Sequence, residues 1–463
     1  MQPRRLILIH GDQTRAIQLA QALVAPLPKE KTQWIDQPGS GRQRLGQSLA
    51  AAVINAHHPL QAEDIGALGG TLVGGGALIM LTPSPPHPGF LQRFLALAAT
   101  GEWVEEISAG GPAPHAITPN WPLAETNIKP TADQQRVIHA CQAALNAAQT
   151  HPLWISADRG RGKSTALGLT LASGAWPNAR LTGPSRAAVA EVLKHAGDYP
   201  PAFAPPEEIK PAKDPLIIDE AAALPLGLLE KLIRENPYCV LAGTVQGYEG
   251  SGRGLELRIP THRITLQQPV RWAADDPLEQ FIHQLLLFYP PQPLHTFSQD
   301  HNSQPPTIEW VEKQQLIDQP ELLTTIFGLL IESHYQTRPR DLQQLLEDPD
   351  LHIAVAVKND QLIGVATARA EGGLDPALAQ LIWLGQRRPM GHLIAQSLSF
   401  HAGINGASSL LGLRLQRIAV KSGYRRSGIG RQLIAALQTQ AMHDGYDWFG
   451  TSFSATPELL DFW

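Results

Sequence analysis

The stretch "LWISADRGRGKST", residues 153–165, decides the fold of the central part of the chain. An apolar run leads into a glycine-rich turn, and "ALGLTLA" continues from it as a helical pattern. In a phosphate loop, backbone N–H groups at a helix start converge on phosphate oxygens, a lysine neutralises the β- and γ-phosphates, and a Ser or Thr hydroxyl holds Mg²⁺. These groups are supplied by Gly160, Gly162, Lys163, Ser164 and Thr165. The stretch therefore predicts an α/β domain that binds ATP.

One position departs from the phosphate-loop pattern. Ala157 stands where the first glycine is expected, and because alanine is the smallest replacement we expect phosphate binding to be retained. A G-K-[ST] triplet also occurs by chance, so its sequence context matters. The predicted nucleotide loop comprises Ala157, Asp158, Arg159, Gly160, Arg161, Gly162, Lys163, Ser164, Thr165 and Ala166.

A second strand pattern, "PLIIDEAAALP" at 215–225, ends on two carboxylates. An acidic pair at the carboxyl end of a strand beside a phosphate loop can hold the magnesium shell and activate water. We expect Asp219, together with Ser164, to contact Mg²⁺ and Glu220 to act on the water. The alternative is an acidic cap at a helix N-terminus.

Further polar residues surround this predicted nucleotide site. A third strand pattern, "YCVLAGTVQGYEGSGRG" at 238–254, places Gln246 where an amide could sense the γ-phosphate. Upstream, "TADQQRVI" at 131–138 offers Gln134 or Gln135 to recognise adenine. Either glutamine could instead be a solvated helix residue.

Length and punctuation predict three domains in the 463 residues. Two segments rich in proline and polar residues, "ITPNWPLAETNIKPT" at 117–131 and "YPPQPLHTFSQDHNSQPPT" at 289–307, divide the chain. We expect an N-terminal α/β domain over 1–118, a phosphate-loop ATPase domain over 119–295 and a third domain over 308–463.

Composition limits the environment and the partners. Two cysteines, Cys141 and Cys239, form neither a CxxC pair nor a metal-type cluster, which suits a reducing cytoplasm. The apolar runs near the N-terminus and at 70–83 are too short for a signal peptide or a membrane span, so we expect a cytoplasmic protein without a membrane partner. A net charge of −5 implies that any nucleic acid would bind local patches.

The third domain carries a second chemistry. The pattern "LHIAVAVKNDQLIGVATARAEGG", 351–373, predicts a β-hairpin that turns at Lys358–Asp360. Residues 411–445 then run strand, tight loop and helix, with Arg425, Gly428 and Gly430 spaced R-x-x-G-x-G. Unhindered backbone N–H groups at such a helix start suit the pyrophosphate of coenzyme A. The alternative is a strand-to-helix turn with structural glycines.

The order of these elements over 325–452 resembles the GNAT acetyltransferase fold. The resemblance implies that the backbone of Ile418, Ala419 and Val420 pairs with the pantetheine arm of acetyl-CoA. It also implies that "YDWFGTSF", 446–453, is the next strand, splayed from the first. The remaining acetyl-CoA residues are expected to be Arg425, Arg426, Ser427, Gly428, Ile429, Gly430, Arg431 and Glu458.

The central part resembles the first core domain of superfamily 1 helicases, because "RLTGPSRAAVAEVL", 180–193, lies between the phosphate loop and the acidic pair. The resemblance implies that Thr182, Pro184 and Ser185 contact a nucleic-acid backbone. It makes Arg271 the expected phosphate-facing arginine, with Arg253 as the alternative. A second motor domain is not visible in the sequence, so we expect remodelling of a bound strand rather than processive unwinding.

A helicase-like ATPase joined to a GNAT domain, with "GTVQGYEGSGRG", "PVRWAADDPLE", "RRPMGHLIAQSLSFHAG" and "QRIAV", resembles the bacterial tRNA(Met) cytidine acetyltransferase family over essentially the whole chain. The resemblance implies N4-acetylcytidine formation at the wobble position of elongator tRNA(Met), using acetyl-CoA, ATP and Mg²⁺, with no DNA partner. His392 and His401 are weak candidates for the general base.

The resemblance also implies that the GNAT domain is incomplete, because the chain ends at Trp463, in the helix after the fifth GNAT strand. We expect either a fragment or a chain completed by a partner. The overall prediction is an α/β protein with an N-terminal α/β domain, a superfamily 1 type phosphate-loop domain and an incomplete GNAT domain. Two alternatives remain open: an ATP-binding RNA-remodelling protein with an inactive acetyltransferase domain, and an ATP-gated protein acetyltransferase.

Overall fold

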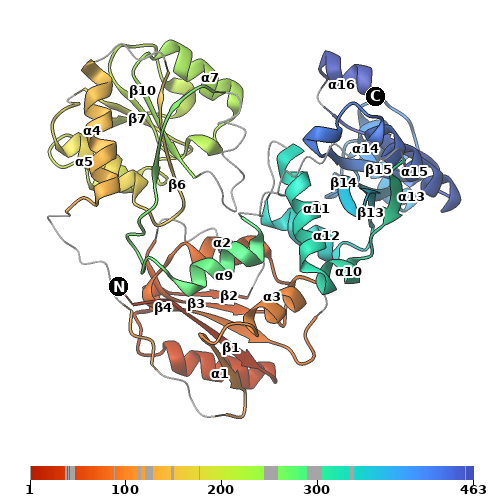
Figure 1. Cartoon of the computed structure of the whole chain (residues 1–463), viewed down its shortest axis with the longest axis horizontal. Coiled ribbons are helices and arrows are strands. Elements are labelled where there is room, and N and C mark those ends of the chain that lie inside the picture. Colours follow the sequence, from red (N-terminus) through yellow and green to blue (C-terminus); the bar gives the residue numbers. More distant parts are fainter. Residues whose placement is uncertain are drawn as a thin grey trace. The chain divides into compact units, whose positions relative to one another are not determined.

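The described residues of the computed structural model form three β-sheets in two compact units, Met1–Tyr289 with Tyr335–Asp341 and Pro290–His334 with Leu342–Trp463 (Figure 1). Each unit is described by itself. The residues that the structure describes are 2–36, 39, 41, 47–87, 89–111, 116–119, 129–146, 151–176, 178–244, 259–288, 305–333, 338–453 and 455–463.

The first sheet is parallel and has the order β2-β3-β4-β1-β5. Its central strands β3 and β4 are buried along their whole length, as expected for a parallel sheet that helices cover on both faces. The apolar runs near the N-terminus and at 70–83 both form strands of this sheet. The five strands are β1 (Arg5–His10), β2 (Thr32–Ile35), β3 (Leu49–Asn55), β4 (Leu72–Thr82) and β5 (Val104–Ser108).

Helix α1 (Gln13–Val24) covers one face of this sheet, and α2 (Ala62–Gly69) and α3 (Phe90–Ala98) lie across the other (Figure 1). A further helix on that second face, α9 (Pro277–Leu286), follows all the strands of the second sheet in the sequence. Its Phe281 ring packs edge-on against Phe94, with the ring centroids 5.0 Å apart. The N-terminal layer is therefore completed by residues that follow the ATPase motifs.

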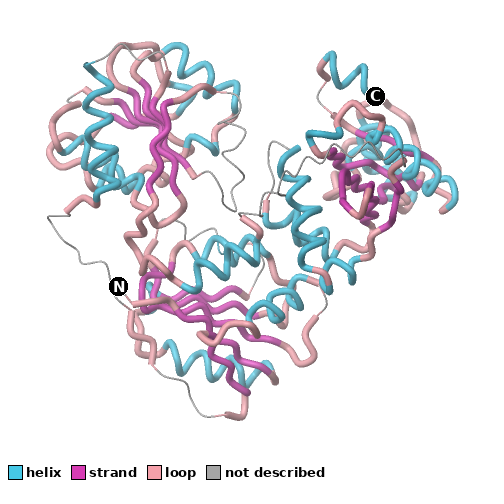
Figure 2. The backbone as a smooth tube through the Cα atoms, in the orientation of Figure 1, coloured by secondary structure: helices cyan, strands magenta, loops and turns pink. Residues whose placement is uncertain are grey.

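The second sheet is also parallel, with the order β11-β6-β10-β9-β7-β8 (Figure 2). Alternate residues of β6 face opposite ways: Leu153 and Ile155 pack towards α4 (Ala132–Asn146) and α5 (Lys163–Ala172), and Trp154 packs towards α7 (Leu226–Glu235). The strands are β6 (Leu153–Ala157), β7 (Arg180–Thr182), β8 (Ala202–Phe203), β9 (Leu216–Ile218), β10 (Cys239–Gly243) and β11 (His262–Leu266), and α6 spans Ala190–Lys194. The carboxyl ends of β6, β9 and β10 therefore meet at one edge of the sheet.

The third sheet has the order β12-β13-β14-β15-β16 and is antiparallel except for the β15–β16 pair. The predicted hairpin is confirmed as β13 (Leu351–Lys358) and β14 (Gln361–Gly372). Asn359 and Asp360, at its turn, have φ of 50° and 57°, the left-handed geometry that a two-residue hairpin favours. The other strands are β12 (Thr307–Trp310), β15 (Leu411–Val420) and β16 (Trp448–Thr451).

Helix α15 (Ile429–His443) packs on the third sheet through Leu433 and Leu437, and α11 (Pro320–Ser333) contacts β14 and β15. Two helices, α13 (Pro376–Trp383) and α14 (Leu393–Phe400), lie between β14 and β15 in sequence. The remaining helices are α10 (Lys313–Asp318), α12 (Pro339–Glu347) and α16 (Pro457–Phe462).

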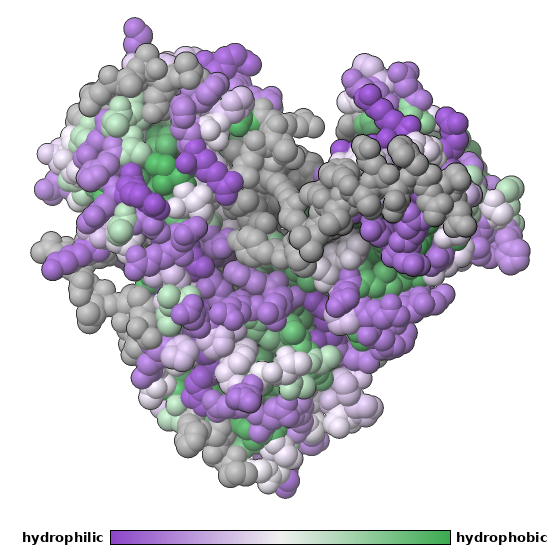
Figure 3. All heavy atoms as spheres, viewed as in Figure 1, coloured by the Kyte–Doolittle hydropathy of each residue, from purple (hydrophilic) through white to green (hydrophobic). Residues whose placement is uncertain are grey.

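Hydrophilic side chains predominate on the face shown in Figure 3, with smaller hydrophobic areas between them. Across the described ranges, no helix has the length and apolar character needed to span a membrane. The apolar residues of the strands are instead buried under the helices of each sheet.

Candidate nucleotide and acetyl-CoA sites

The phosphate loop lies between the end of β6 at Ala157 and the start of α5 at Lys163. Ala157 still pairs with Leu266 of β11, so the sharp turn begins after it and no glycine is needed at that position. Gly160 and Gly162 have φ of +75° and +77°, a region that glycine enters without strain. A Cβ atom on Gly162 would lie 2.4 Å from Nε2 of Gln134.

The loop brings the predicted catalytic groups together. The Lys163 ammonium donates to Glu220 Oε1 at 3.4 Å and to Thr244 Oγ1 at 3.3 Å. The Ser164 hydroxyl donates to Asp219 Oδ2 at 2.7 Å. A hydroxyl and a carboxylate oxygen in contact form the hard donor pair that Mg²⁺ prefers, so these residues fit a magnesium ion held with a nucleotide.

The two carboxylates differ in their electrostatics. Burial, reinforced by the neighbouring Glu220 carboxylate, raises the pKa of Asp219 to about 6. Burial also acts to raise the pKa of Glu220, but Lys163 and Arg159 outweigh it and hold that pKa below its ordinary value. Glu220 therefore carries its charge where Lys163 can neutralise it.

Of the two candidate glutamines, the structure buries one. Gln134 accepts from the Thr131 N–H at 2.9 Å and donates to the Gly162 carbonyl at 3.2 Å, so its side chain supports the loop. Gln135 is exposed on the next position of α4. The recognition of adenine by either side chain stays a prediction.

Residues 270–279 connect the loop to the N-terminal sheet. Arg271, the expected phosphate-facing arginine, is partly buried and donates to the Gly70 carbonyl at 3.1 Å. Asp158 and Arg159 line a recess together with Trp272 and residues of α2 and α9. Sequence reasoning did not identify Trp272, whose only signal was a tryptophan in a polar segment.

The predicted nucleic-acid loop follows β7. Pro184 and Ser185 are exposed, but Thr182 is fully buried and its hydroxyl donates to the Ala204 carbonyl at 2.8 Å. A fully buried side chain has no surface to offer RNA, so the expected contact of Thr182 is wrong. Two residues predicted for the nucleotide site, Gln246 and Arg253, lie outside the described residues.

The acetyl-CoA prediction concerns the edge of β15 that faces β16. Within the described residues these strands pair over Gly412–Leu415 and Trp448–Thr451. Ile418, Ala419 and Val420 lie beyond that pairing, and β14 is the one described strand with which they pair. A backbone edge that is open on one side can pair with an extended ligand, although the Val420 carbonyl already accepts from Arg425 Nε at 3.1 Å.

The loop from β15 into α15 is exposed. Arg426 and Gly428 have φ of +62° and +85°, and no described atom lies within 4 Å of a Cβ built on Gly428. The first N–H groups of a helix have no partner within the helix, so α15 presents donors here. A Cβ on Gly430 would lie 3.2 Å from the Phe462 ring, which places α16, with the exposed Glu458, beside the loop.

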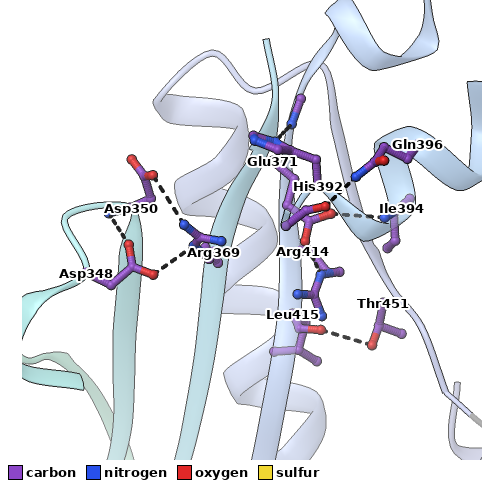
Figure 4. Close-up of polar contacts among 12 residues, drawn as sticks. Asp348, Asp350, Arg369, Glu371, His392, Ile394, Gln396, Arg414, Leu415 and Thr451 are labelled. Atoms are coloured by element: carbon purple, nitrogen blue, oxygen red, sulfur yellow. Dashed lines mark hydrogen bonds and ion pairs between the residues drawn. The ribbon is translucent and has the colours of Figure 1, made fainter. Parts of the chain in front are cut away.

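The histidine candidates lie on α14. His392 caps the start of this helix, and its Nδ1 accepts from the Gly372 N–H at 2.9 Å (Figure 4). A neutral ring that accepts a hydrogen bond at Nδ1 carries its proton on Nε2, so neither nitrogen is free to accept a proton from substrate. This geometry does not support His392 as the general base. His401 is exposed at the other end of α14, its ring 4.9 Å from that of Phe400.

An ion pair that sequence reasoning missed, between the buried Glu371 and the partly buried Arg414, lies beside His392. Figure 4 shows Glu371 of β14 between Arg414 of β15 and the first turn of α14. One carboxylate oxygen accepts from Arg414 Nε and the other from the Ile394 N–H at 3.0 Å. The only signal in the sequence was a carboxylate inside an apolar strand pattern. This pair fixes α14 on the sheet where β15 and β16 begin to separate.

Three family models match the chain. They are "tRNA(Met) cytidine acetyltransferase TmcA, N-terminal" at residues 2–89, "RNA cytidine acetyltransferase NAT10/TcmA, helicase domain" at 154–289 and "GNAT acetyltransferase 2" at 325–445. Each match overlaps one of the three sheets formed by the described residues. The matches confirm the resemblance to a helicase-like domain and to a GNAT domain.

Among solved structures, the chain is similar to an aminoglycoside N-acetyltransferase AAC(6')-Iy in complex with CoA. The identity is 19% over 34% of this chain and 84% of that chain, with a TM-score of 0.22, which adds nothing to the assignment.

Curated relatives match nearly the whole chain, and each is named tRNA(Met) cytidine acetyltransferase TmcA. The protein of Pectobacterium atrosepticum is 36% identical over 98% of this chain and 68% of its own length. The protein of Nitrosococcus halophilus is 31% identical, and that of Yersinia pestis is 34% identical. Each of these two matches covers 99% of this chain and 71% of the relative's own length. The chain therefore belongs to the tRNA(Met) cytidine acetyltransferase family.

Proposed function

We propose that the chain transfers the acetyl group of acetyl-CoA to the N4 amine of the wobble cytidine of elongator tRNA(Met), driven by ATP hydrolysis. One observation carries the proposal: the open edge of β15 runs directly into the exposed glycine turn of α15. Family membership supports the substrate class. The phosphate loop in the other unit supports the use of ATP.

In the nucleotide site, Lys163 neutralises phosphate charge and the loop backbone donates to phosphate oxygens. Ser164 and Asp219 are the residues that would hold Mg²⁺, and a bound Mg²⁺ would neutralise charge that develops on the phosphates. Glu220, kept ionised by Lys163, orients the attacking water. The work of hydrolysis is to take the target base out of its stack, because a stacked anticodon base cannot enter a pocket.

In the acetyltransferase site, the backbone of Ile418–Val420 pairs with the pantetheine arm, and the Arg425–Arg431 loop holds the pyrophosphate. The cytosine amine is a poor nucleophile, because its lone pair is delocalised into the ring. The site must therefore orient the amine against the thioester carbonyl and accept a proton as the N–C bond forms and the thiolate leaves. The residue that accepts the proton is not assigned.

The test is incubation of the purified chain with acetyl-CoA, ATP, Mg²⁺ and unmodified tRNA(Met), followed by nuclease digestion and mass spectrometry for acetylcytidine. The control RNA carries uridine at the wobble position. Acetylcytidine in the first RNA and none in the second supports the proposal. Reactions without ATP, and with Lys163→Ala, should yield less product.

Two results would overturn the proposal and each favours one alternative. If acetyl-CoA and ATP bind but no acetylcytidine forms, the chain is an RNA-remodelling protein with an inactive acetyltransferase domain. If acetyl groups appear on protein amines and not on RNA, it is an ATP-gated protein acetyltransferase.

A further inference from the structure

We propose that Trp272 is a positioning residue for the phosphate loop, and that Arg4 of the N-terminal sheet holds Trp272 in place. The inference rests on the proposed ATP site. It makes the N-terminal sheet part of the machinery that sets nucleotide affinity.

The first contact is between Trp272 and the phosphate loop. The ring lies so close to Gly160 that a Cβ built there would be 2.3 Å from Cη2 and 2.8 Å from Cζ2 and Cζ3. Nearby, the Val270 N–H donates to the Gly160 carbonyl at 2.8 Å. Gly160 is thus held through its Cα and its carbonyl oxygen by two residues of one segment.

The second contact fixes the orientation of the ring. The Trp272 indole N–H donates to Glu279 Oε2 at 3.0 Å, and the other oxygen of the same carboxylate pairs with Arg161 of the loop at 2.8 Å. All three side chains are buried or nearly so. A ring that is hydrogen-bonded at its nitrogen and packed at its opposite edge is held in one orientation. Because Glu279 also pairs with Arg161, the same carboxylate links the Trp272 ring to the phosphate loop.

The third contact comes from the N-terminal sheet. The Arg4 guanidinium carbon lies 3.7 Å from the centroid of the Trp272 ring, on its face. Arg4 is 2% exposed and donates to Asp276 twice, from its backbone N–H at 2.8 Å and from Nε at 3.0 Å. Asp276 in turn caps α9 by accepting from the Glu279 N–H at 2.9 Å.

These contacts form a buried path from Arg4 through Trp272 to Gly160. A phosphate loop binds through backbone N–H groups whose positions must match the phosphate oxygens, so a small displacement of Gly160 weakens several hydrogen bonds together. Loss of the Trp272 ring removes the surface against which Gly160 rests. ATP binding should therefore weaken, although Trp272 acts through Gly160 and is not proposed to contact ATP.

The test is titration of the chain with ATP and Mg²⁺, which yields both Kd and the number of sites. Trp272→Leu should raise the Kd for ATP about tenfold with an unchanged number of sites, because partial unfolding removes sites without altering Kd. Trp272→Phe keeps a flat ring against Gly160 and under Arg4, so it should recover most of the affinity. Equal ATP affinity in the wild type and in Trp272→Leu would overturn the inference.

The role of Arg4 needs a variant that does not leave Asp276 charged and buried without its partner. The double variant Arg4→Met with Asp276→Asn removes both charges and should also raise the Kd for ATP several-fold. The matched control is Arg5→Ala, the next residue of the same strand, whose guanidinium pairs with Glu105 at 2.6 Å. An equal rise in Kd in the Arg5 variant would overturn the role of Arg4.

ATP titration of the wild type and of the variants separates the proposed function from the positioning role of Trp272. If the wild-type chain does not bind ATP, the proposed function fails. If it binds ATP and the Trp272 and Arg4 variants bind it equally well, only the positioning inference fails.

Discussion

The Ser164 hydroxyl donates to Asp219 Oδ2 at 2.7 Å and so joins the first turn of α5 to the end of β9. Strand β10 lies between β6 and β9 in the sheet, so the contact spans two strand spacings. Lys163 precedes Ser164 and Glu220 follows Asp219, and these two residues also form an ion pair, with Nζ 3.4 Å from Oε1. Two adjacent pairs therefore align the phosphate loop with the acidic pair.

The Ser164–Asp219 contact predicts how the chain depends on magnesium. Ser164→Ala removes the hydroxyl, and the Mg²⁺ concentration at half-maximal ATP hydrolysis should rise about tenfold or more. Ser173→Ala is the control, because Ser173 ends the same helix and donates to the Thr170 carbonyl at 2.7 Å. An unchanged Mg²⁺ titration in Ser164→Ala would remove this residue from the metal site.

Lys163 is predicted to be required for hydrolysis. Lys163→Ala removes the charge that faces the phosphates and leaves Glu220 without its ammonium partner, so the rate of ATP hydrolysis should fall about 100-fold. Lys194→Ala provides the comparison, because Lys194 is exposed and its ion pair with Glu191 lies at the surface. Similar phosphate release by both variants would contradict the assignment.

The glycine turn of α15 is predicted to bind acetyl-CoA. Gly428 and Gly445 lie at opposite ends of this helix, with φ of +85° and +77° and no described atom within 4 Å of a built Cβ. Gly428→Ala and Gly445→Ala should therefore cost similar stability, about 1 kcal/mol each. Calorimetric titration should show that only Gly428→Ala weakens acetyl-CoA binding. Equal affinity in the two variants would place the pyrophosphate elsewhere.

The Glu371–Arg414 pair is predicted to hold α14 in place. Glu371→Ala leaves the partly buried Arg414 guanidinium and the Ile394 N–H without their partner, which costs about 1–3 kcal/mol. Amide exchange over Leu393–Phe400 should then become about tenfold faster or more. Asp350→Ala is the control, because Asp350 is 55% exposed and 3.9 Å from Arg369. Unchanged exchange in Glu371→Ala would show that the pair does not secure the helix.

The strands, turns and loops that carry the two predicted sites could be found in the sequence, because their signals are local. The Asn359–Asp360 turn and the glycines at 160, 162 and 428 each adopt the left-handed backbone that their residue types allow. Ala157 was flagged as a departure, and the structure supplies the reason: the residue still belongs to β6.

Other features could not be found because they depend on partners far away in the chain. The apolar pattern of α9 predicts a buried helix but does not say which sheet it covers. Thr182 follows the pattern of an RNA-contacting loop, yet Ala204 accepts its hydroxyl in the interior. The charges of Arg4 and Glu371 give no indication of their partners, which lie 272 and 43 residues away.

The sequence by itself determined the two chemistries, because a phosphate loop and a pyrophosphate-binding turn are built from consecutive backbone groups whose geometry the local residues set. The tertiary structure alone decided what supports them: Trp272 against Gly160, Arg4 over Trp272, and Glu371 between Arg414 and α14. Burial makes these contacts strong, and only the packing of distant segments creates burial. The order of residues along the chain does not record which segments will meet.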